Sequence, residues 1–293
     1  MRRAVGEDRT VTSSLPPLAV TGSTGRLGGR IARLLAAAGV PQRLVVRDPA
    51  RAPQLPGSSV AVASYDDGPA VRAALAGAST VLMVSAAEHP DRLDQHRTFV
   101  DAAADAGVEH LVYVSFLGAA PEATFTLARD HWATEEHIRS RGLPATFLRD
   151  SLYADFFPFL TGEDGVIRGP AGDGRVAAVA QDDVADAAVA VLGDPAAHAG
   201  ATYDLTGPAA LTLAEVAETI TAVSGRPVSY TAETVEEAYA SRAGYGAPRW
   251  QVDAWVSTYT AIAAGELAGV ITAVADLTGR PATTLAQHLA ART

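Results

Sequence analysis

Three glycines near the N-terminus have the spacing of a phosphate-binding turn. Gly22, Gly25 and Gly28 follow a short apolar run, 18–20, and stand where a helical pattern begins. In a strand–turn–helix unit, such glycines allow the tight turn, the approach of the backbone to a pyrophosphate, and close packing of helix on strand. The anion then lies on the free N–H groups and positive dipole end of the helix. The pattern predicts a dinucleotide site; the alternative is a glycine-rich turn in another kind of α/β protein.

The second apolar run ends in a basic residue. Arg47 directly follows Val46, and Asp48 and Pro49 come next. In dinucleotide folds, an acid at this place binds the ribose hydroxyls of NAD, whereas an arginine accommodates the 2′-phosphate of NADP. Asp48 precedes a proline and therefore suits a turn or a helix start. The arrangement favours NADP(H) over NAD.

The composition excludes several kinds of chemistry. All 23 basic residues are arginine and cysteine is absent, which removes Schiff-base lysines, P-loop lysines, disulfides and thiolate catalysis. No histidine has acidic neighbours at the spacing of a metal site, so no metal site is predicted. The net charge of −10 argues against nucleic acid as a direct partner. A small-molecule substrate is expected, and a homodimer is a possible assembly.

Residues 1–14 carry several charges and no apolar core segment, so they do not resemble a signal peptide. We expect them to form a disordered tail. No apolar stretch approaches the length needed to span a membrane, and the sequence predicts a cytoplasmic protein.

Apolar runs alternate with helical patterns through the first two-thirds of the chain. Helices are predicted near 26–38, 68–76, 91–106 and 128–141. Continuous apolar strands separated by helices predict a parallel sheet covered on both faces, the Rossmann doubly wound α/β fold. The predicted strands are 18–20, 43–46, 60–64, 81–85, 111–115 and 145–149.

The alternation of strand and helix patterns changes after residue 150, where an aromatic cluster and a glycine-rich stretch precede mostly helical patterns. We therefore predict two domains. The NADP-binding Rossmann domain covers 15–155, and 176–206 returns to its sheet. The smaller, mostly helical substrate or lid domain combines 156–175 and 207–293.

Several of these segments resemble a known family. The segment 21–29, the run Val46–Pro49, the run Tyr113–Phe116 and the pair His131 and Glu135 resemble the NmrA-like branch of the atypical short-chain dehydrogenases/reductases. Within it, the likeness is greatest to the NAD(P)H:quinone oxidoreductase type 2 group. The resemblance covers roughly residues 18 to 290. It implies a Rossmann fold, NADP(H) and reduction of a quinone.

The chain departs from ordinary members of that superfamily. Those use a serine, a tyrosine and, four residues after the tyrosine, a lysine. Ser115 stands at the serine position, but His131 replaces the lysine and Leu127 stands four positions before it. A ketone that receives hydride becomes a basic alkoxide and needs a positioned acid, whereas a quinone becomes a stable phenolate. The departure therefore favours hydride transfer to a quinone or a similar flat carbonyl acceptor.

The resemblance also implies the site residues, each of which has ordinary packing as its alternative. The catalytic candidates are His131, Ser115 and Tyr153. The acceptor would lie against an aromatic wall of Phe116, Tyr153, Phe156 and Phe157. The cofactor candidates are Gly22, Thr24, Gly25, Arg26, Leu27 and Gly28 at the pyrophosphate, Arg47 at the 2′-phosphate, and Ser64 and Tyr65 at the adenine. Ser85 and Ala86 end the fourth strand at the ligand-binding edge of the sheet, and His131 would be a hydrogen-bonding partner of a ribose or of the substrate.

Two other functions remain open. NmrA-like proteins include redox sensors that bind the dinucleotide and a protein partner without turnover. A tailoring reductase of secondary metabolism could use His131 or Tyr153 as its acid. An open apolar pocket facing the nicotinamide would favour an enzyme.

Overall fold

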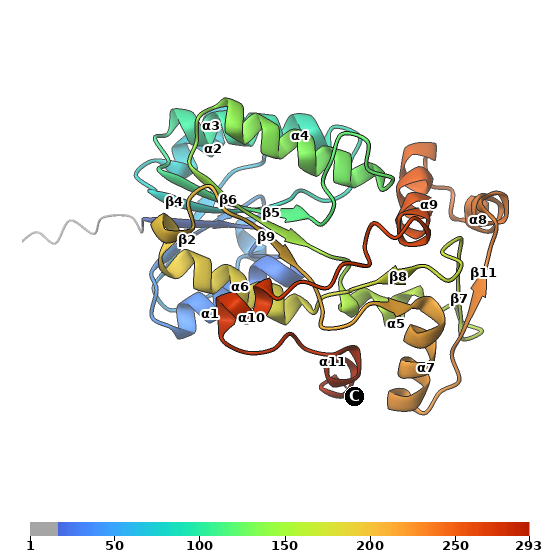
Figure 1. Cartoon of the computed structure of the whole chain (residues 1–293). Helices are drawn as coiled ribbons and strands as arrows, with labels where there is room; N and C mark the ends of the chain where they lie inside the picture. Colours follow the sequence, from blue (N-terminus) through green and yellow to red (C-terminus); the bar gives the residue numbers. More distant parts are fainter. Residues whose placement is uncertain (1–16, 293) are drawn as a thin grey trace, which may run out of the picture.

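A computed structural model describes residues 17–292, and the predicted tail 1–14 lies outside the described residues. Its centre is a parallel sheet of seven strands in the order β3-β2-β1-β4-β5-β6-β9 (Figure 1). This order confirms the Rossmann fold, and it reverses between β1 and β4, where such sheets bind their ligands. The strands are β1 (Leu18–Thr21), β2 (Gln42–Val46), β3 (Ser58–Val62), β4 (Thr80–Val84), β5 (His110–Phe116), β6 (Ala145–Asp150) and β9 (Thr202–Leu205).

Helices cover both faces of this sheet, as Figure 1 shows. Alternate strand residues supply two cores: Leu82 packs on the side of α1 and α6, and Val81 and Met83 pack on the side of α2 and α3. Strands buried on both faces must be apolar throughout, which explains the continuous runs in the sequence. The covering helices are α1 (Arg26–Ala37) and α6 (Gln181–Gly193) on one face, and α2 (Gly68–Leu75), α3 (Arg92–Asp105) and α4 (Thr126–Ser140) on the other.

The third strand begins and ends earlier than predicted. It covers Ser58–Val62 rather than 60–64, so Ser64 and Tyr65 lie beyond its end. It is the edge strand of the sheet, and Val60 and Val62 are about half exposed. An edge strand is covered less completely, and its apolar pattern therefore defines its ends less sharply.

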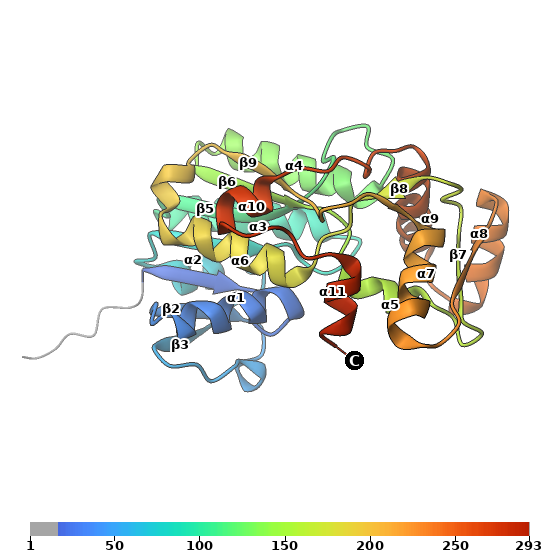
Figure 2. The same ribbon diagram turned by 60° about the horizontal axis from the view of Figure 1, so that its bottom comes forward.

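The rest of the chain forms a smaller body beside the carboxyl edge of the sheet (Figure 2). It contains an antiparallel pair of β8 (Arg175–Val176) with β10 (Leu211–Thr212), and a parallel pair of β7 (Val166–Gly169) with β11 (Ser229–Ala232). Its described helices begin with η2 (Ala154–Phe156) and α5 (Phe157–Leu160), followed by α7 (Leu213–Ser224), α8 (Val235–Arg242), α9 (Arg249–Ala263) and α11 (Leu285–Ala290). Three of them, α7, α8 and α11, start with a threonine capping box.

One helix near the C-terminus returns to the sheet. In α10 (Ala273–Thr278), Ala273 and Val274 belong to the core shared by α1 and α6. The chain after it is tied to α6 through the buried Asp183, which accepts hydrogen bonds from the backbone N–H of Thr283 at 2.7 Å and from Arg280 at 2.7 Å. None of the helices in residues 17–292 is long and apolar enough to cross a membrane.

Candidate functional site

The glycine turn lies at the carboxyl end of β1 and has the close contacts that the spacing predicts. Gly22 has φ of 66°, and its carbonyl oxygen accepts the N–H of Gly25 at 2.9 Å. A Cβ atom at Gly28 would lie 2.4 Å from the Gly22 carbonyl oxygen. Only glycine therefore lets α1 approach the turn this closely.

Hydrogen-bonding groups remain free at this turn. The first residue before α1, Gly25, has no side chain to cap the helix, so the first N–H groups of the helix need an outside partner. The hydroxyl of Ser23 is buried and has no hydrogen-bond partner among the described residues. Thr24 and Arg26 are exposed beside it, whereas the Leu27 side chain is buried and can offer a ligand only its backbone. These groups fit a dinucleotide pyrophosphate.

Arg47 lies just beyond the end of β2. Its side chain is exposed and has no ion-pair partner in residues 17–292. The neighbouring Asp48 accepts the N–H of Ala50 at 2.9 Å and caps the short helix η1 (Pro49–Arg51). The interpretation of Asp48 as a helix-start residue is confirmed. The exposed guanidinium of Arg47 is accessible to a phosphate, and its charge helps to lower the pKa of Asp66.

The predicted adenine contacts have partners within the protein. The hydroxyl of Tyr65 donates to the carbonyl oxygen of Val84 at 2.7 Å and lies 2.6 Å from Oγ1 of Thr21. Burial raises the pKa of Tyr65 far above its usual value, so this hydroxyl stays protonated. Tyr65 thus braces β1 against β4. Ser64 lies beside it, and its hydrogen bond lowers the pKa of the exposed Asp66. An adenine contact by Ser64 or Tyr65 stays a prediction.

His131, on α4, is buried and uses both ring nitrogens. Its Nε2 lies 2.9 Å from Nη2 of Arg92, and its Nδ1 lies 2.9 Å from the hydroxyl of Tyr113. Because a guanidinium only donates, Nε2 must accept, and the proton lies on Nδ1. Burial and the Arg92 charge lower the pKa of His131 well below its usual value, so the ring is neutral. His131 would have to give up one of these partners to bind a ribose or a substrate directly.

Ser115, on β5, is also fully engaged. Its hydroxyl donates to Oε1 of Glu135 at 2.6 Å, and both residues are completely buried. Arg149 of β6 binds the same carboxylate through two nitrogens, at 2.8 and 2.6 Å. The proton of Ser115 therefore points to a buried anion. Because its proton is used in this bond, Ser115 could contact a substrate only by accepting a hydrogen bond through its oxygen.

Tyr153, which follows β6, donates its hydroxyl to the carboxyl group of Asp150. Asp150 is only 4% exposed, and it forms no ion pair with any residue in 17–292. Burial raises the pKa of Asp150 well above its usual value, and burial with this carboxyl raises the pKa of Tyr153. The two side chains form a carboxyl–phenol pair at the carboxyl end of the sheet, and burial favours the protonated form of each. His131, Ser115 and Tyr153 thus lie at one edge, but each belongs to a separate hydrogen-bonded group.

The four predicted wall residues separate into two sets. Phe156 is 42% exposed, and its ring lies 5.6 Å from that of Tyr153. Phe116 packs against Phe125 at 4.8 Å and is buried, and Phe157 is 2% exposed in the core of the smaller body. Only Tyr153 and Phe156 therefore offer ring surface at the edge of the sheet.

An arginine of the glycine turn joins this surface. The Arg26 guanidinium lies over the rings of Phe156 at 5.9 Å and Phe159 at 4.9 Å. Such a cation–π contact adds about 0.5–1 kcal/mol at an exposed site. Phe159, which was not among the predicted site residues, is 69% exposed and extends the aromatic surface. Its place in the aromatic cluster after residue 150 was the available signal.

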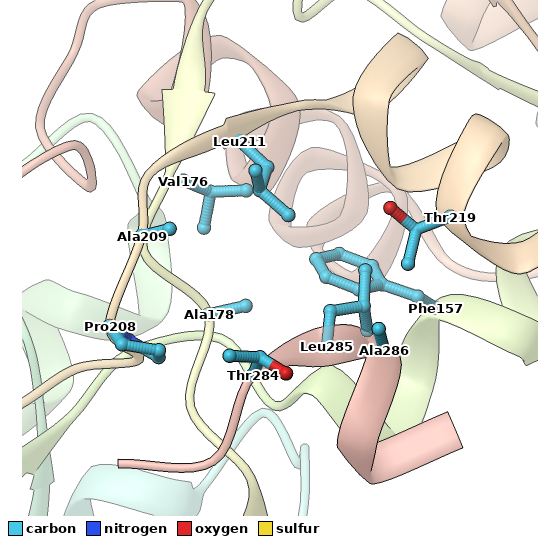
Figure 3. A pocket seen from close by; sticks show the side chains of 10 residues that line it. All are labelled: Phe157, Val176, Ala178, Pro208, Ala209, Leu211, Thr219, Thr284, Leu285 and Ala286. Atoms are coloured by element: carbon cyan, nitrogen blue, oxygen red, sulfur yellow. The ribbon is translucent and has the colours of Figure 1, made fainter. Parts of the chain in front are cut away.

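A cavity of about 180 Å³ lies in the smaller body, and the ring of Phe157 forms part of its wall (Figure 3). Apart from the hydroxyls of Thr219 and Thr284, its lining side chains are apolar. They come from α5, α7, α11, β8, β10 and the loops next to these strands, and comprise Phe157, Val176, Ala178, Pro208, Ala209, Leu211, Thr219, Thr284, Leu285 and Ala286. Phe157 is the one predicted site residue that lines it. In the described part of the chain, no three His, Asp or Glu side chains are grouped as a metal site would need.

Comparison with known proteins places this geometry in a family. The model of the NmrA-like family matches residues 17–247. The chain belongs to the NmrA-like family. This confirms the resemblance predicted from the glycine turn, Arg47 and the His131 helix.

Several characterised relatives can be aligned with almost the whole length of this NmrA-like chain. It is 34% identical over 273 residues to the NAD(P)H azoreductase of Xenophilus azovorans, which covers 92% of this chain and 95% of that protein. It is 33% identical over 280 residues to Quinone oxidoreductase 2 of Escherichia coli, with coverage of 93% and 97%. The solved structure of an Escherichia coli NADPH-dependent quinone oxidoreductase with NADPH superimposes with a TM-score of 0.86 at 33% identity, covering 94% of this chain and 99% of that one.

Proposed function

We propose that this NmrA-like protein is an oxidoreductase that transfers a hydride from NADPH to a quinone or a similarly flat carbonyl acceptor. The relatives that carry the names azoreductase and quinone oxidoreductase support the reaction class and the cofactor. The residues at the carboxyl edge of the sheet support the finer points, which are the NADPH preference and the type of acceptor.

The described residues fit NADP(H). The glycine turn and the uncapped start of α1 would hold the pyrophosphate, and Arg47 would bind the 2′-phosphate. The turn after β4, with Ser85 and Ala86, follows the reversal of strand order and would lie along the nicotinamide half. When bound, the cofactor supplies the hydride, and the protein's part is to orient it toward the acceptor.

The hydrogen bond from Ser115 to Glu135 is the observation that carries the choice of acceptor. The chain has no lysine, and the hydroxyl of this serine donates its hydrogen bond to the buried carboxylate of Glu135. The site therefore lacks the serine–tyrosine–lysine set with which ordinary short-chain dehydrogenases stabilise an alkoxide. A quinone needs less help, because hydride transfer yields an aromatic phenolate that water can protonate.

The exposed ring surface suits such an acceptor. Tyr153 and Phe156 lie next to each other, and Arg26 bridges Phe156 to Phe159. A flat ring stacked on this surface would be held close to the cofactor, which is the main requirement for a transfer that depends on proximity. A small-molecule acceptor, no direct nucleic-acid contact and a cytoplasmic location remain part of the proposal.

The test is steady-state oxidation of NADPH with matched pairs of acceptors. Each quinone is paired with a saturated cyclic ketone of the same ring size, each rate is corrected for the reaction without protein, and NADH replaces NADPH in parallel. We expect turnover of quinones with NADPH and none of the ketones. Turnover of ketones but not quinones would indicate a tailoring reductase. Tight NADPH binding without turnover would indicate a redox sensor.

A further inference from the structure

The turn between β4 and α3 begins with three residues that have small side chains. Residues Ser85, Ala86 and Ala87 are small, and they follow β4 where the strand order reverses. A dinucleotide that crossed the sheet there would meet mainly their backbone. The position of that backbone must be set by other residues, because small side chains provide few contacts.

Two side chains from the start of α3 hold the backbone of Ala86 from both sides. Nε2 of His96 accepts the Ala86 N–H at 2.9 Å, and Nε of Arg92 donates to the Ala86 carbonyl oxygen at 3.0 Å. Both side chains are buried, at 0% and 3% exposure. The donor and the acceptor of a single residue are thus both satisfied from within the protein.

A second layer fixes the orientation of these two side chains. Since the Ala86 N–H can only donate, the proton of His96 lies on Nδ1, which donates to Thr134 at 2.9 Å. The remaining nitrogens of Arg92 lie 2.9 Å from Nε2 of His131 and 3.3 Å from Asp130. Three of these partners belong to α4, so α4 supports the clamp on Ala86 through α3.

The far end of the same turn is tied to the smaller body. Oε2 of Glu88 accepts hydrogen bonds from Nε2 of Gln251 at 3.1 Å and from Nε1 of Trp255 at 3.3 Å, both on α9. The turn 85–91 is therefore held at one end by buried side chains and at the other by exposed ones.

We propose that Arg92 and His96 are positioning residues that hold the Ala86 peptide in the geometry needed to bind the nicotinamide half of NADP(H). This inference rests on the proposed function for the identity of the ligand. The buried position of His131 then has a definite explanation: its neutral ring serves as the acceptor that orients Arg92.

A matched pair of variants separates the two bonds of His96. In His96→Gln, the amide reaches the place of Nε2 and its oxygen can accept the Ala86 N–H. In His96→Asn, the shorter amide reaches the place of Nδ1, keeps Thr134 as a partner and loses Ala86. Each variant keeps one bond, so a purely structural role predicts similar losses of stability in both.

We expect the dissociation constant for NADPH, measured by its fluorescence, to rise roughly tenfold in His96→Asn and by less than about threefold in His96→Gln. Adenosine 2′,5′-bisphosphate, which lacks the nicotinamide half, should bind both variants like wild type. Equal NADPH affinities for the two variants would overturn the inference.

Amide hydrogen exchange of the protein without cofactor provides a readout independent of binding. Exchange in 85–91 should be faster in His96→Asn than in His96→Gln, and equal rates would contradict the clamp. If wild type binds no NADPH, the proposed function fails, and the exchange rates still decide whether His96 holds the turn.

Discussion

The hydroxyl of Ser115 donates a hydrogen bond of 2.6 Å to the buried carboxylate of Glu135. The same carboxylate is bound by Arg149 on the next strand and by Arg139 on its own helix. Charge-assisted hydrogen bonds to guanidinium groups are short and about twice as strong as neutral ones. In a ketone reductase this serine would hydrogen-bond the substrate. Here Ser115 instead connects β5 to α4 through Glu135.

Replacing Ser115 tests whether its role is structural rather than catalytic. In Ser115→Ala, we expect kcat with a quinone to stay within about threefold of wild type, because loss of a true general acid would cost about 10²–10⁴-fold. Steady-state kinetics measures the effect. A loss of a hundredfold or more with unchanged stability would show that Ser115 acts on the substrate.

Glu135→Gln is the contrasting variant, and its main effect should be on folding. It leaves the partly buried Arg149 without its charge partner, which should lower the free energy of unfolding by about 2 kcal/mol. Urea denaturation of both variants would separate the structural role of Glu135 from the small effect expected at Ser115.

Arg47 should determine the choice of cofactor. Removing its guanidinium in Arg47→Ala should raise the KM for NADPH by roughly ten- to a hundredfold and leave the KM for NADH almost unchanged. The preference for NADPH would then disappear. Arg51→Ala removes another exposed arginine a few residues further on and should change neither constant. Equal losses with both cofactors would argue against a phosphate contact at Arg47.

Gly28 should tolerate no side chain. In Gly28→Ala the new methyl group would lie 2.4 Å from the carbonyl oxygen of Gly22, so α1 must move away from the turn. We expect a loss of about 1–3 kcal/mol in unfolding free energy together with weaker NADPH binding. Gly193→Ala is the control, because nothing lies within 4 Å of a Cβ atom there. Thermal melts with and without NADPH would show whether the two glycines differ.

Asp150 gives the protein a characteristic pH dependence. Its raised pKa means that the folded chain keeps a proton that the unfolded chain releases above the ordinary carboxyl pKa of 3.8. Stability from this group therefore falls as pH rises from about 4 toward the raised value. Asp150→Asn does not titrate and keeps an oxygen that accepts the Tyr153 hydroxyl.

At pH 8 we expect Asp150→Asn to be more stable than wild type by about 1 kcal/mol or more. This advantage should shrink toward pH 4. Urea unfolding at several pH values measures the difference, and a difference independent of pH would mean that Asp150 is charged in the folded protein.

Structural features that depend on only a few neighbouring residues could be predicted well from the sequence. The glycine turn, the strand-ending Arg47 and the capping role of Asp48 depend on neighbours a few residues away, so spacing alone identifies them. The continuous apolar strands likewise revealed the sheet, except at the edge strand β3, where solvent exposure weakens the pattern.

Partners that meet only in the folded chain could not be predicted. Glu135 finds Ser115 and Arg149 on two strands, and nothing in the local sequence of any of them indicates the others. Phe156 and Phe157 are adjacent in sequence, but one faces solvent and the other the core, because the chain changes from η2 to α5 between them. Such short helical turns have too few residues to show which face is apolar.

The return of α10 to the sheet affects the order in which this protein can fold as it is made. Ala273 and Val274 complete a core whose other members, on α1, α6 and β9, leave the ribosome much earlier. Domains usually fold as units once their sequence is available. Here the nucleotide-binding body lacks α10 against α6 and β9 until almost the whole chain has been synthesised. Most of the smaller body, up to α9, must therefore emerge before the core of the larger body is complete.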